Sequence, residues 1–258
     1  MKLITLNSGS NGNAIYLESD DGNSAIMLDC GISRLQIEAR LKVHGRAPHA
    51  DLPVFITHEH GDHVRGLASL SKTYHMRSYM TEATYRKLYA RPEVKGFRFM
   101  GNTETVEHGA FRVTAFPKKH DAADPVGFLV ESDGARFLYL TDLGEENPEA
   151  LALLPTADGM LIESNYDLDM LLAGDYPQWL KLRVQSDVGH LSNEQAALLV
   201  KQHTGGMLRT LVLGHLSANN NTPECAETAM RAALANRNGT SPALHVASRH
   251  NVGDIIEV

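Results

Sequence analysis

The stretch Thr57-His58-Glu59-His60-Gly61-Asp62-His63 directly follows the apolar run Val54-Phe55-Ile56. It places four metal-capable side chains within six positions, namely His58, His60, Asp62 and His63. Core packing does not need this density of imidazole and carboxylate groups, whereas zinc and related divalent ions bind such nitrogen and oxygen atoms. Gly61 interrupts the spacing of a helical His-Glu-x-x-His site. We therefore expect a strand and a loop that supply half of a metal site. The alternative is a solvated, His-rich turn.

The pattern His-x-His-x-Asp-His after a short strand resembles the signature of the metallo-β-lactamase superfamily. The resemblance implies an α/β fold, the four-layer αββα sandwich of that family. It also implies a third His, a bridging Asp and a final His, each at the end of a later strand. The sequence has a candidate for each in the expected order: His120, Asp142 and His215.

Taken singly, each of these three residues also fits a role outside a metal site. His120 follows an alternating segment, and a lone His there is typical of a loop. Asp142 ends an apolar run, and its carboxylate is a candidate for capping a helix that begins near Glu146. His215 also follows a strand-like run. Three matches in the right order favour metal binding over these separate roles.

The resemblance implies two divalent ions with separate ligand sets and one shared carboxylate: His58, His60 and His120 for one ion, Asp62, His63 and His215 for the second, and Asp142 as the bridge. Two cations roughly 3.5–4 Å apart share a hydroxide and clamp both oxygens of an in-line displacement, which suits phosphoester hydrolysis. Asp62 is also expected to act in catalysis. Histidine-rich ligation suits Zn²⁺, and Mn²⁺ and iron are further candidates because availability and ligand geometry also select the ion.

A second motif, Gly189-His190-Leu191-Ser192, helps to choose among the chemistries of this superfamily. It resembles a region of ribonuclease Z in which an additional His lies near the scissile phosphate. His190 is therefore expected to be catalytic, as the proton donor to the leaving oxygen or as a phosphate contact. The alternative is a His that only packs at the N-terminus of a helix over residues 192–202.

Further matches extend over nearly the whole chain and resemble the small bacterial exonucleases of the WalJ (YycJ) type. They are Ser8–Asn13, Leu28–Gly31, Glu163–Asp167 and His215–Asn221. This resemblance implies a metal-dependent phosphodiesterase that trims DNA from 5′ ends, with a role in DNA repair. The DNA preference and the polarity come from the resemblance alone. A small-molecule metallohydrolase acting on a thioester, cyclic phosphodiester or lactone is the alternative function, because it would keep the same ligands.

Substrate contacts are expected from four residues: Lys118, Lys119, Asn219 and Arg249. The formal net charge of −7 argues weakly against a nucleic-acid partner, because bound ions would outweigh the site carboxylates and local cations remain. Adjacent lysines are ordinarily solvated surface, and Asn219 is equally suited to turning the chain. DNA is favoured over RNA as the partner.

Length and composition indicate one domain over residues 1–258, since 43% hydrophobic content supports a single sizeable core. The N-terminal apolar stretch is too short for a signal peptide, and no run approaches the ~18 apolar residues of a membrane span. We therefore expect a cytoplasmic protein without a membrane partner, of open oligomeric state. Two cysteines argue against a disulfide framework, and Cys30 is expected to be a small buried thiol. The single tryptophan, Trp179, is expected in the core rather than at an interface.

Periodicity predicts strands in the first half and alternating strands and helices afterwards. The predicted strands are 14–18, 25–28, 54–56, 111–116, 126–130 and 137–140. The predicted helices are 35–43, 83–89, 194–202 and 225–235. Ser192 is predicted as an N-cap, with Gln195 in the capping-box position.

Overall fold

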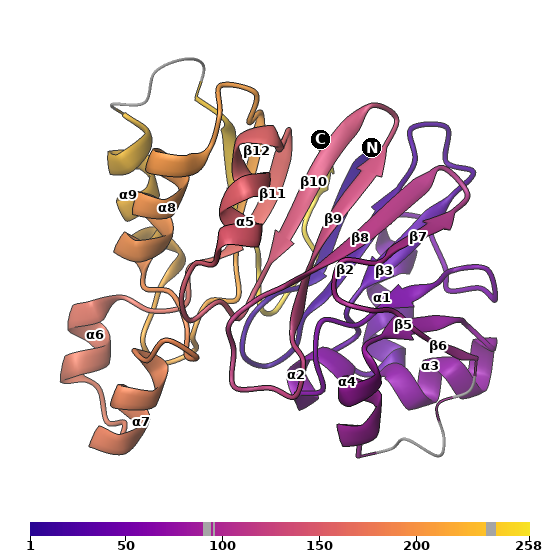
Figure 1. Cartoon of the computed structure of the whole chain (residues 1–258), viewed down its shortest axis with the longest axis horizontal. Helices are drawn as coiled ribbons and strands as arrows, with labels where there is room; N and C mark the ends of the chain where they lie inside the picture. Colours follow the sequence, from indigo (N-terminus) through magenta and orange to yellow (C-terminus); the bar gives the residue numbers. More distant parts are fainter. Residues whose placement is uncertain (90–93, 95, 236–240) are drawn as a thin grey trace.

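The computed structural model describes residues 1–89, 94, 96–235 and 241–258, which form two seven-stranded sheets that face each other (Figure 1). The first sheet has the order β14 (Ile255–Glu257), β1 (Lys2–Asn7), β2 (Ala14–Glu18), β3 (Ala25–Leu28), β4 (Val54–Phe55), β5 (Ser78–Met80) and β6 (Phe97–Phe99). The second has the order β13 (Ala243–Val246), β12 (Thr210–Gly214), β11 (Gly159–Glu163), β10 (Ala135–Leu140), β9 (Val126–Ser132), β8 (Phe111–Pro117) and β7 (Thr105–His108).

Helices cover the outer face of each sheet. The first sheet carries α1 (Arg34–Val43) and α3 (Leu67–Tyr74), and the second carries α5 (Pro148–Leu153), α8 (Asn193–His203) and α9 (Pro223–Leu234). The remaining elements are short: α2 (Gly61–Val64), α4 (Glu82–Lys87), the 3₁₀ turn η2 (Leu154–Thr156), α6 (Leu168–Ala173) and α7 (Gln178–Val184). The expected four-layer αββα sandwich is confirmed.

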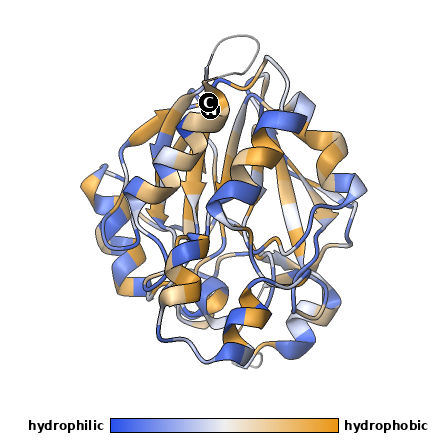
Figure 2. Ribbon diagram, turned by 90° about the vertical axis from the view of Figure 1, so that its left-hand side faces the viewer, coloured by the Kyte–Doolittle hydropathy of each residue, from blue (hydrophilic) through white to orange (hydrophobic). Residues whose placement is uncertain are grey.

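Side chains alternate between the two faces of each strand, and the buried apolar ones form three layers. One layer lies between the sheets, and one lies between each sheet and its helices. In β10, Phe137 and Tyr139 point into the core between the sheets, whereas Leu138 and Leu140 point toward α5 and α8. In β3, Ile26 faces the opposite sheet. Successive side chains of a strand point to opposite faces, so a strand covered on both sides is apolar throughout. Figure 2 accordingly shows largely hydrophobic strands between helices that carry both hydrophilic and hydrophobic residues.

Parallel pairing brings several strand ends to one edge of the sandwich. β10, β11, β12 and β13 run parallel in the second sheet, and β3, β4, β5 and β6 run parallel in the first. Loops that leave the carboxyl ends of parallel strands meet at the same edge. This edge lies near α2, in the lower middle of Figure 1.

The predicted elements agree with the structure apart from their ends. β2 and β3 have the predicted bounds, and α8 extends the predicted helix by one residue at each end. α4 stops at Lys87 instead of continuing to residue 89. The Ser192 capping box is confirmed, because Ser192 Oγ accepts from the Gln195 N–H at 3.1 Å and Gln195 Oε1 accepts from the Ser192 N–H at 2.8 Å. Cys30 is fully buried, as predicted.

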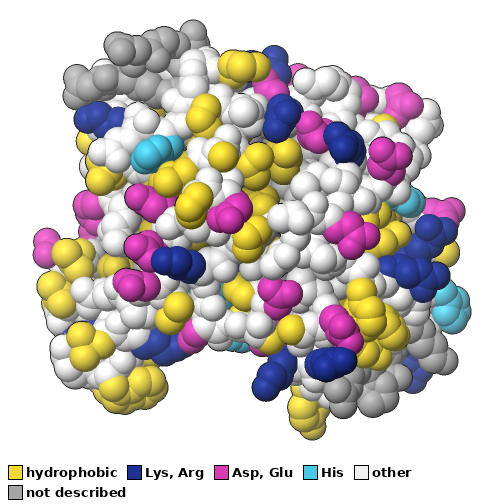
Figure 3. Space-filling view, in the orientation of Figure 1, with side chains coloured by type: hydrophobic (Ala, Val, Ile, Leu, Met, Phe, Trp, Pro, Cys, Tyr) yellow, Lys and Arg dark blue, Asp and Glu magenta, His cyan; other side chains and the backbone are white. Residues whose placement is uncertain are grey.

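The structure corrects the capping role considered for Asp142 and the core position predicted for Trp179. Asp142 does not cap a helix, because α5 begins at Pro148 and its N-cap is Asn147, whose Oδ1 accepts from the Ala150 N–H at 2.9 Å. Trp179 lies in α7 and is 67% exposed, so it is not a core residue. Figure 3 shows hydrophobic side chains gathered at the corner where Figure 1 places α6 and α7. The helices in the described ranges are all too short or too polar to cross a membrane.

Candidate metal centre

Three imidazoles from two loops form the first group of potential ligands. His58 and His60 follow β4, and His120 follows β8. His60 Nδ1 lies 3.1 Å from His58 Nε2 and 3.3 Å from His120 Nε2. Ligand atoms about 2.1 Å from one tetrahedral ion lie roughly 3.4 Å from each other. The spacing of these three nitrogens therefore fits one shared ion.

A second group lies beside the first. His215 Nε2 is 3.4 Å from Asp62 Oδ2, and His63 Nε2 is 3.6 Å from the same oxygen. Asp62 and His63 belong to α2, which begins directly after His60. His215 follows β12. The second predicted ligand set thus occupies one volume, although Asp62 and His215 lie 153 positions apart in the sequence.

Asp142 lies between the two groups. Its Oδ1 is 3.6 Å from His120 Nε2 and 3.5 Å from His215 Nε2, and its Oδ2 is 3.0 Å from His63 Nε2. The Asp142 carboxylate is buried, and imidazole nitrogens of both ligand groups surround its oxygens. Its position among imidazole nitrogens fits a bridge between two cations.

In His58, His63 and His120, the ring nitrogen that points away from the cluster, Nδ1, lies against a hydrogen-bond acceptor. His63 Nδ1 lies 2.7 Å from Asp29 Oδ2, and His58 Nδ1 lies 2.9 Å from Thr57 Oγ1. Thr57 Oγ1 in turn donates to Asp29 Oδ2 at 3.0 Å. His120 Nδ1 lies 3.2 Å from the carbonyl oxygen of Gly189. Such contacts place a proton on Nδ1 and leave the lone pair of Nε2 free to face an ion.

Backbone conformation also aims the side chains. Asp29, Asp142 and His215 have φ angles of 57°, 53° and 53°, in the left-handed region. Each follows the end of a strand, at β3, β10 and β12. A residue other than glycine seldom adopts this conformation, and when it does the surroundings impose it. The turn takes the chain out of the extended conformation and directs the side chain into the cluster.

The electrostatic environment favours cations at the centre. Burial alone would lower the pKa of His63, but Asp142, Asp29 and Asp62 outweigh it and raise the pKa to about 10. Burial opposes ionisation of Asp62, yet His63 and His215 lower its pKa to about 2. Carboxylates that stabilise a proton on His63 Nε2 equally stabilise a metal cation beside it. The donor set therefore fits divalent metal ions.

His190 lies within this cluster. Its Nδ1 is 3.1 Å from Glu163 Oε2, and its ring centroid is 5.4 Å from that of His120 and 5.2 Å from that of His215. The side chain is 14% exposed. His190 therefore lies beside the ligand groups and does not only pack against the start of α8.

Two site residues, Glu163 and Asp29, lie in motifs that the sequence analysis noted, but it gave them no role in the site. Glu163 is fully buried, and its Oε2 lies 3.1 Å from Nδ1 of both His190 and His215. Burial opposes its ionisation, but the neighbouring His190 and His215 lower its pKa to about 2. Both carboxylates occur at strand ends after apolar runs, the same signal that identified Asp142. That signal would have found them, although not their partners.

The residues predicted to contact substrate lie in different surroundings. Lys118 is buried, its Nζ donates to the Thr141 carbonyl oxygen at 2.5 Å, and burial lowers its pKa. Adjacent residues of an extended chain point to opposite sides, so Lys118 turns inward while Lys119 is exposed and paired with Glu145. Asn219 is exposed, with Nδ2 3.3 Å from the Tyr176 hydroxyl oxygen. Arg249 is half-buried in the C-terminal segment.

A sandwich of two facing sheets with this His/Asp cluster at one edge defines the class of metallo-β-lactamase-fold hydrolases. The model of the β-lactamase superfamily domain matches residues 24–216. The chain therefore belongs to the metallo-β-lactamase superfamily. Within it, the chain is 35% identical over 241 residues to the exodeoxyribonuclease WalJ of Streptococcus pneumoniae serotype 2 (strain D39 / NCTC 7466), covering 91% of this chain and 88% of that protein. It is 32% identical to the exodeoxyribonuclease YycJ of Bacillus anthracis, covering 89% and 87%. These relatives place it in the WalJ/YycJ branch.

Solved structures show the same fold. Zn²⁺-bound PqqB from Methylobacterium extorquens superposes with a TM-score of 0.73 at 19% identity, covering 98% of this chain and 100% of that one. The short form of human tRNase Z has a TM-score of 0.63 at 18% identity, covering both chains completely. The fold and the nuclease relatives together support a metal-binding hydrolase of the nuclease type.

Proposed function

We propose that the chain is a cytoplasmic DNA exonuclease that uses two divalent ions to remove nucleotides from 5′ ends, and that it acts in DNA repair. The position of Asp142 carries the proposal, because its two oxygens lie within 3.6 Å of imidazole nitrogens from both ligand groups. The exodeoxyribonuclease names of the relatives supply the DNA substrate. The 5′ polarity comes from the resemblance to this branch.

The ligand assignment follows the two groups. His58, His60 and His120 would hold one ion, Asp62, His63 and His215 the other, and Asp142 both. When bound, such a pair of Zn²⁺, Mn²⁺ or iron ions activates water and neutralises the charge of the phosphate under attack. Asp62, whose side chain is 22% exposed, remains ionised and is suited to accept a hydrogen bond from the attacking water.

His190 supplies the proton that the leaving group needs. Glu163 holds the N–H at Nδ1, so the proton that His190 gives up is the one on Nε2. That nitrogen has no protein hydrogen-bond partner in the described part of the chain. Removal of a 5′ nucleotide breaks the bond between phosphorus and the 3′ oxygen of that nucleotide. Protonation of this oxygen by His190 Nε2 allows it to leave as a hydroxyl group.

The test is release of nucleotides from duplex and single-stranded DNA labelled at either end, with Zn²⁺ or Mn²⁺. Stepwise loss of 5′ nucleotides by the wild type, abolished in His58→Ala, supports the proposal. Digestion from the 3′ end would overturn the polarity. No digestion by metal-loaded protein, together with turnover of a thioester, lactone or cyclic phosphodiester, would favour the small-molecule hydrolase instead.

A further inference from the structure

The loop over residues 8–13 joins β1 to β2 and lies beside the second ligand group of the candidate metal centre. We call it the N-terminal loop. It belongs to the sequence motifs shared with the WalJ type, yet no step of the proposed reaction uses it. Ser8 and Asn13, at its two ends, are 1% and 0% exposed. Buried polar side chains normally have hydrogen-bond partners, so the partners of these two residues indicate what the loop supports.

Ser8 supports the predicted ligand His215. Ser8 Oγ accepts from the His215 N–H at 2.8 Å, at the point where the chain leaves β12 with a φ angle of 53°. Gly214 permits this approach, because a Cβ at that position would lie 2.7 Å from Ser8 Oγ. The Ser8 N–H itself donates to the Ser248 carbonyl oxygen at 3.1 Å. Ser8 therefore fixes the backbone of His215 and with it the direction of the imidazole.

Asn13 supports the predicted ligands Asp62 and His63. The Asn13 N–H donates to the Asp62 carbonyl oxygen at 2.7 Å, and Asn13 Nδ2 lies 3.1 Å from His63 Nε2. The amide is oriented by the Gly9 N–H, which donates to Asn13 Oδ1 at 3.0 Å. Asn13 thus presents an N–H to His63 Nε2, and such a contact requires a lone pair on that nitrogen. This is the tautomer that binds a metal ion.

Backbone packing leaves the N-terminal loop no room to shift against α2. The Gly31 N–H donates to the Asn13 carbonyl oxygen at 2.6 Å. A Cβ at Gly31 would lie 1.6 Å from the Asp62 carbonyl oxygen, so only glycine fits there. Protein interiors packed this closely transmit displacements to their neighbours. A change at Asn13 should therefore reach Asp62.

A hydrogen bond between the two ends of the loop joins these supports. Ser8 Oγ donates to Asn13 Oδ1 at 3.3 Å. His215 follows β12 of the second sheet, whereas Asp62 and His63 lie in α2, which follows β4 of the first. The N-terminal loop therefore links the ligands that come from one sheet to the ligand that comes from the other.

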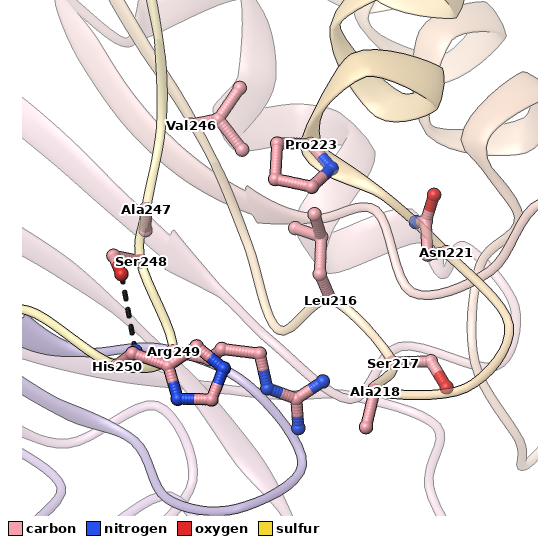
Figure 4. A pocket seen from close by; sticks show the side chains of 10 residues that line it. All are labelled: Leu216, Ser217, Ala218, Asn221, Pro223, Val246, Ala247, Ser248, Arg249 and His250. Atoms are coloured by element: carbon pink, nitrogen blue, oxygen red, sulfur yellow. Dashed lines mark hydrogen bonds between the residues drawn. The ribbon is translucent and has the colours of Figure 1, made fainter.

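The C-terminal segment holds the N-terminal loop from another side. In Figure 4 the faint indigo ribbon of the N-terminal part of the chain passes beside Arg249 and His250. Asn11 Nδ2 donates to the Arg249 carbonyl oxygen at 3.0 Å. Gly9 lies so close that a Cβ there would meet Arg249 Cβ at 3.1 Å. The loop is thus held between the C-terminal segment and the ligand residues.

The first ligand group has different supports. His58 Nδ1 lies against Thr57 Oγ1, and His120 Nδ1 lies against the Gly189 carbonyl oxygen. Among the hydrogen bonds of the described residues, those of the N-terminal loop reach the second group and none reaches His58, His60 or His120. The loop therefore distinguishes the two groups.

We propose that Ser8 and Asn13 are positioning residues for the second ion alone, which hold His215 in register with Asp62 and His63 across the two sheets. This inference rests on the two-ion centre of the proposed function. Removal of a hydrogen-bonding partner behind a metal ligand typically costs ~10- to 100-fold in metal affinity. Loss of either side chain should weaken the second ion by this factor and leave the first ion unaffected.

The experiment isolates each ion by removing a ligand of the other. His58→Ala leaves the second ligand group complete, and His215→Ala leaves the first complete. The affinity of the metal-free proteins for Zn²⁺ is measured by competition with a chromogenic chelator. Ser8→Ala and Asn13→Ala should each lower the affinity by ~10- to 100-fold in the His58→Ala background. Neither should change it in the His215→Ala background.

Ser19→Ala is the matched control. Ser19 is 0% exposed, and its Oγ accepts from the Ser24 N–H at 3.0 Å in the turn between β2 and β3. Like Ser8→Ala, it removes a buried hydroxyl that accepts a backbone hydrogen bond. It should lower the Tm of the metal-free protein but leave the Zn²⁺ affinity unchanged in both backgrounds. Circular dichroism and Tm verify that each variant is folded.

Each result decides for or against the loop. The inference is overturned if Ser8→Ala and Asn13→Ala leave the affinity of the second ion unchanged, or if they weaken both ions equally. If one of these variants does not fold, the other decides. A wild type that binds two Zn²⁺ ions but digests no DNA overturns the proposed function and not this inference, so the two failures are distinguishable.

Discussion

Glu163 Oε2 lies 3.1 Å from Nδ1 of His215, and this one oxygen also lies 3.1 Å from Nδ1 of His190. The other carboxylate oxygen accepts from the backbone N–H groups of Leu143 and Leu191 at 2.8 and 2.9 Å. The carboxylate is therefore held from both sides. It connects a predicted metal ligand with the predicted proton donor, so its effects should extend to metal affinity as well as to catalysis.

Glu163→Gln should weaken metal binding by ~10- to 100-fold, because the amide has one acceptor oxygen and cannot orient His215 as the carboxylate does. Competition with a chromogenic chelator measures the affinity. Glu149→Gln, an exposed substitution on α5, provides the matched control and should leave the affinity unchanged. Equal affinities in wild type and Glu163→Gln would show that the carboxylate does not support the ligand.

His190→Ala should reduce kcat on DNA by ~100-fold or more while metal content stays near that of the wild type. The loss should be much smaller on a p-nitrophenyl phosphodiester, because p-nitrophenolate leaves without protonation. Parallel kinetics on the two substrates, with metal analysis of each preparation, test this role. Comparable losses on both substrates would remove His190 from the role of proton donor.

Metal removal should destabilise the protein, since the ions bind the folded state and bring together carboxylates and histidines from four loops. At a metal concentration of ~1,000 times Kd, binding contributes about 4 kcal/mol to the free energy of unfolding. Thermal unfolding with Zn²⁺ or Mn²⁺ and after chelation measures the difference. His58→Ala should show a reduced metal-dependent shift in Tm, and a full shift in this variant would place the ion elsewhere.

Cys30 should be unreactive in the folded protein, because burial raises the pKa of its thiol well above the ordinary value and blocks access. Alkylation of the Cys225→Ser variant at pH 8 isolates this thiol. Labelling is expected only after denaturation. Rapid labelling of the native variant would contradict the packing of the layer between the first sheet and α1.

Trp179 is expected to behave as a solvated indole. Its fluorescence emission should resemble that of tryptophan in water and should be quenched readily by acrylamide, because the residue is 67% exposed. Trp179→Ala should change the free energy of unfolding by no more than ~0.5 kcal/mol, as for most surface substitutions. A blue-shifted and protected emission would show that α7 is covered in solution.

Most of the predicted ligands could be proposed from the sequence because they closely follow short apolar strands. His58 and His60 follow β4, and His215 follows β12, so local patterning marked them before any tertiary contact was known. The order of these strand ends along the chain then matched one family. The Ser192 capping box could be predicted for the same reason, since its two residues lie three positions apart.

The sequence by itself determined the strands, the packed helices and the side chains capable of holding ions, because these depend on patterns within a few residues. The tertiary structure alone decided which carboxylates meet which histidines: Asp29 reaches His63 across 34 positions, and Glu163 reaches His215 across 52. It also turned Lys118 inward, exposed Trp179 and placed Arg249 beside the loop after His215. Contacts of this kind depend on how the sheets pair and face each other, and a linear pattern does not record that arrangement.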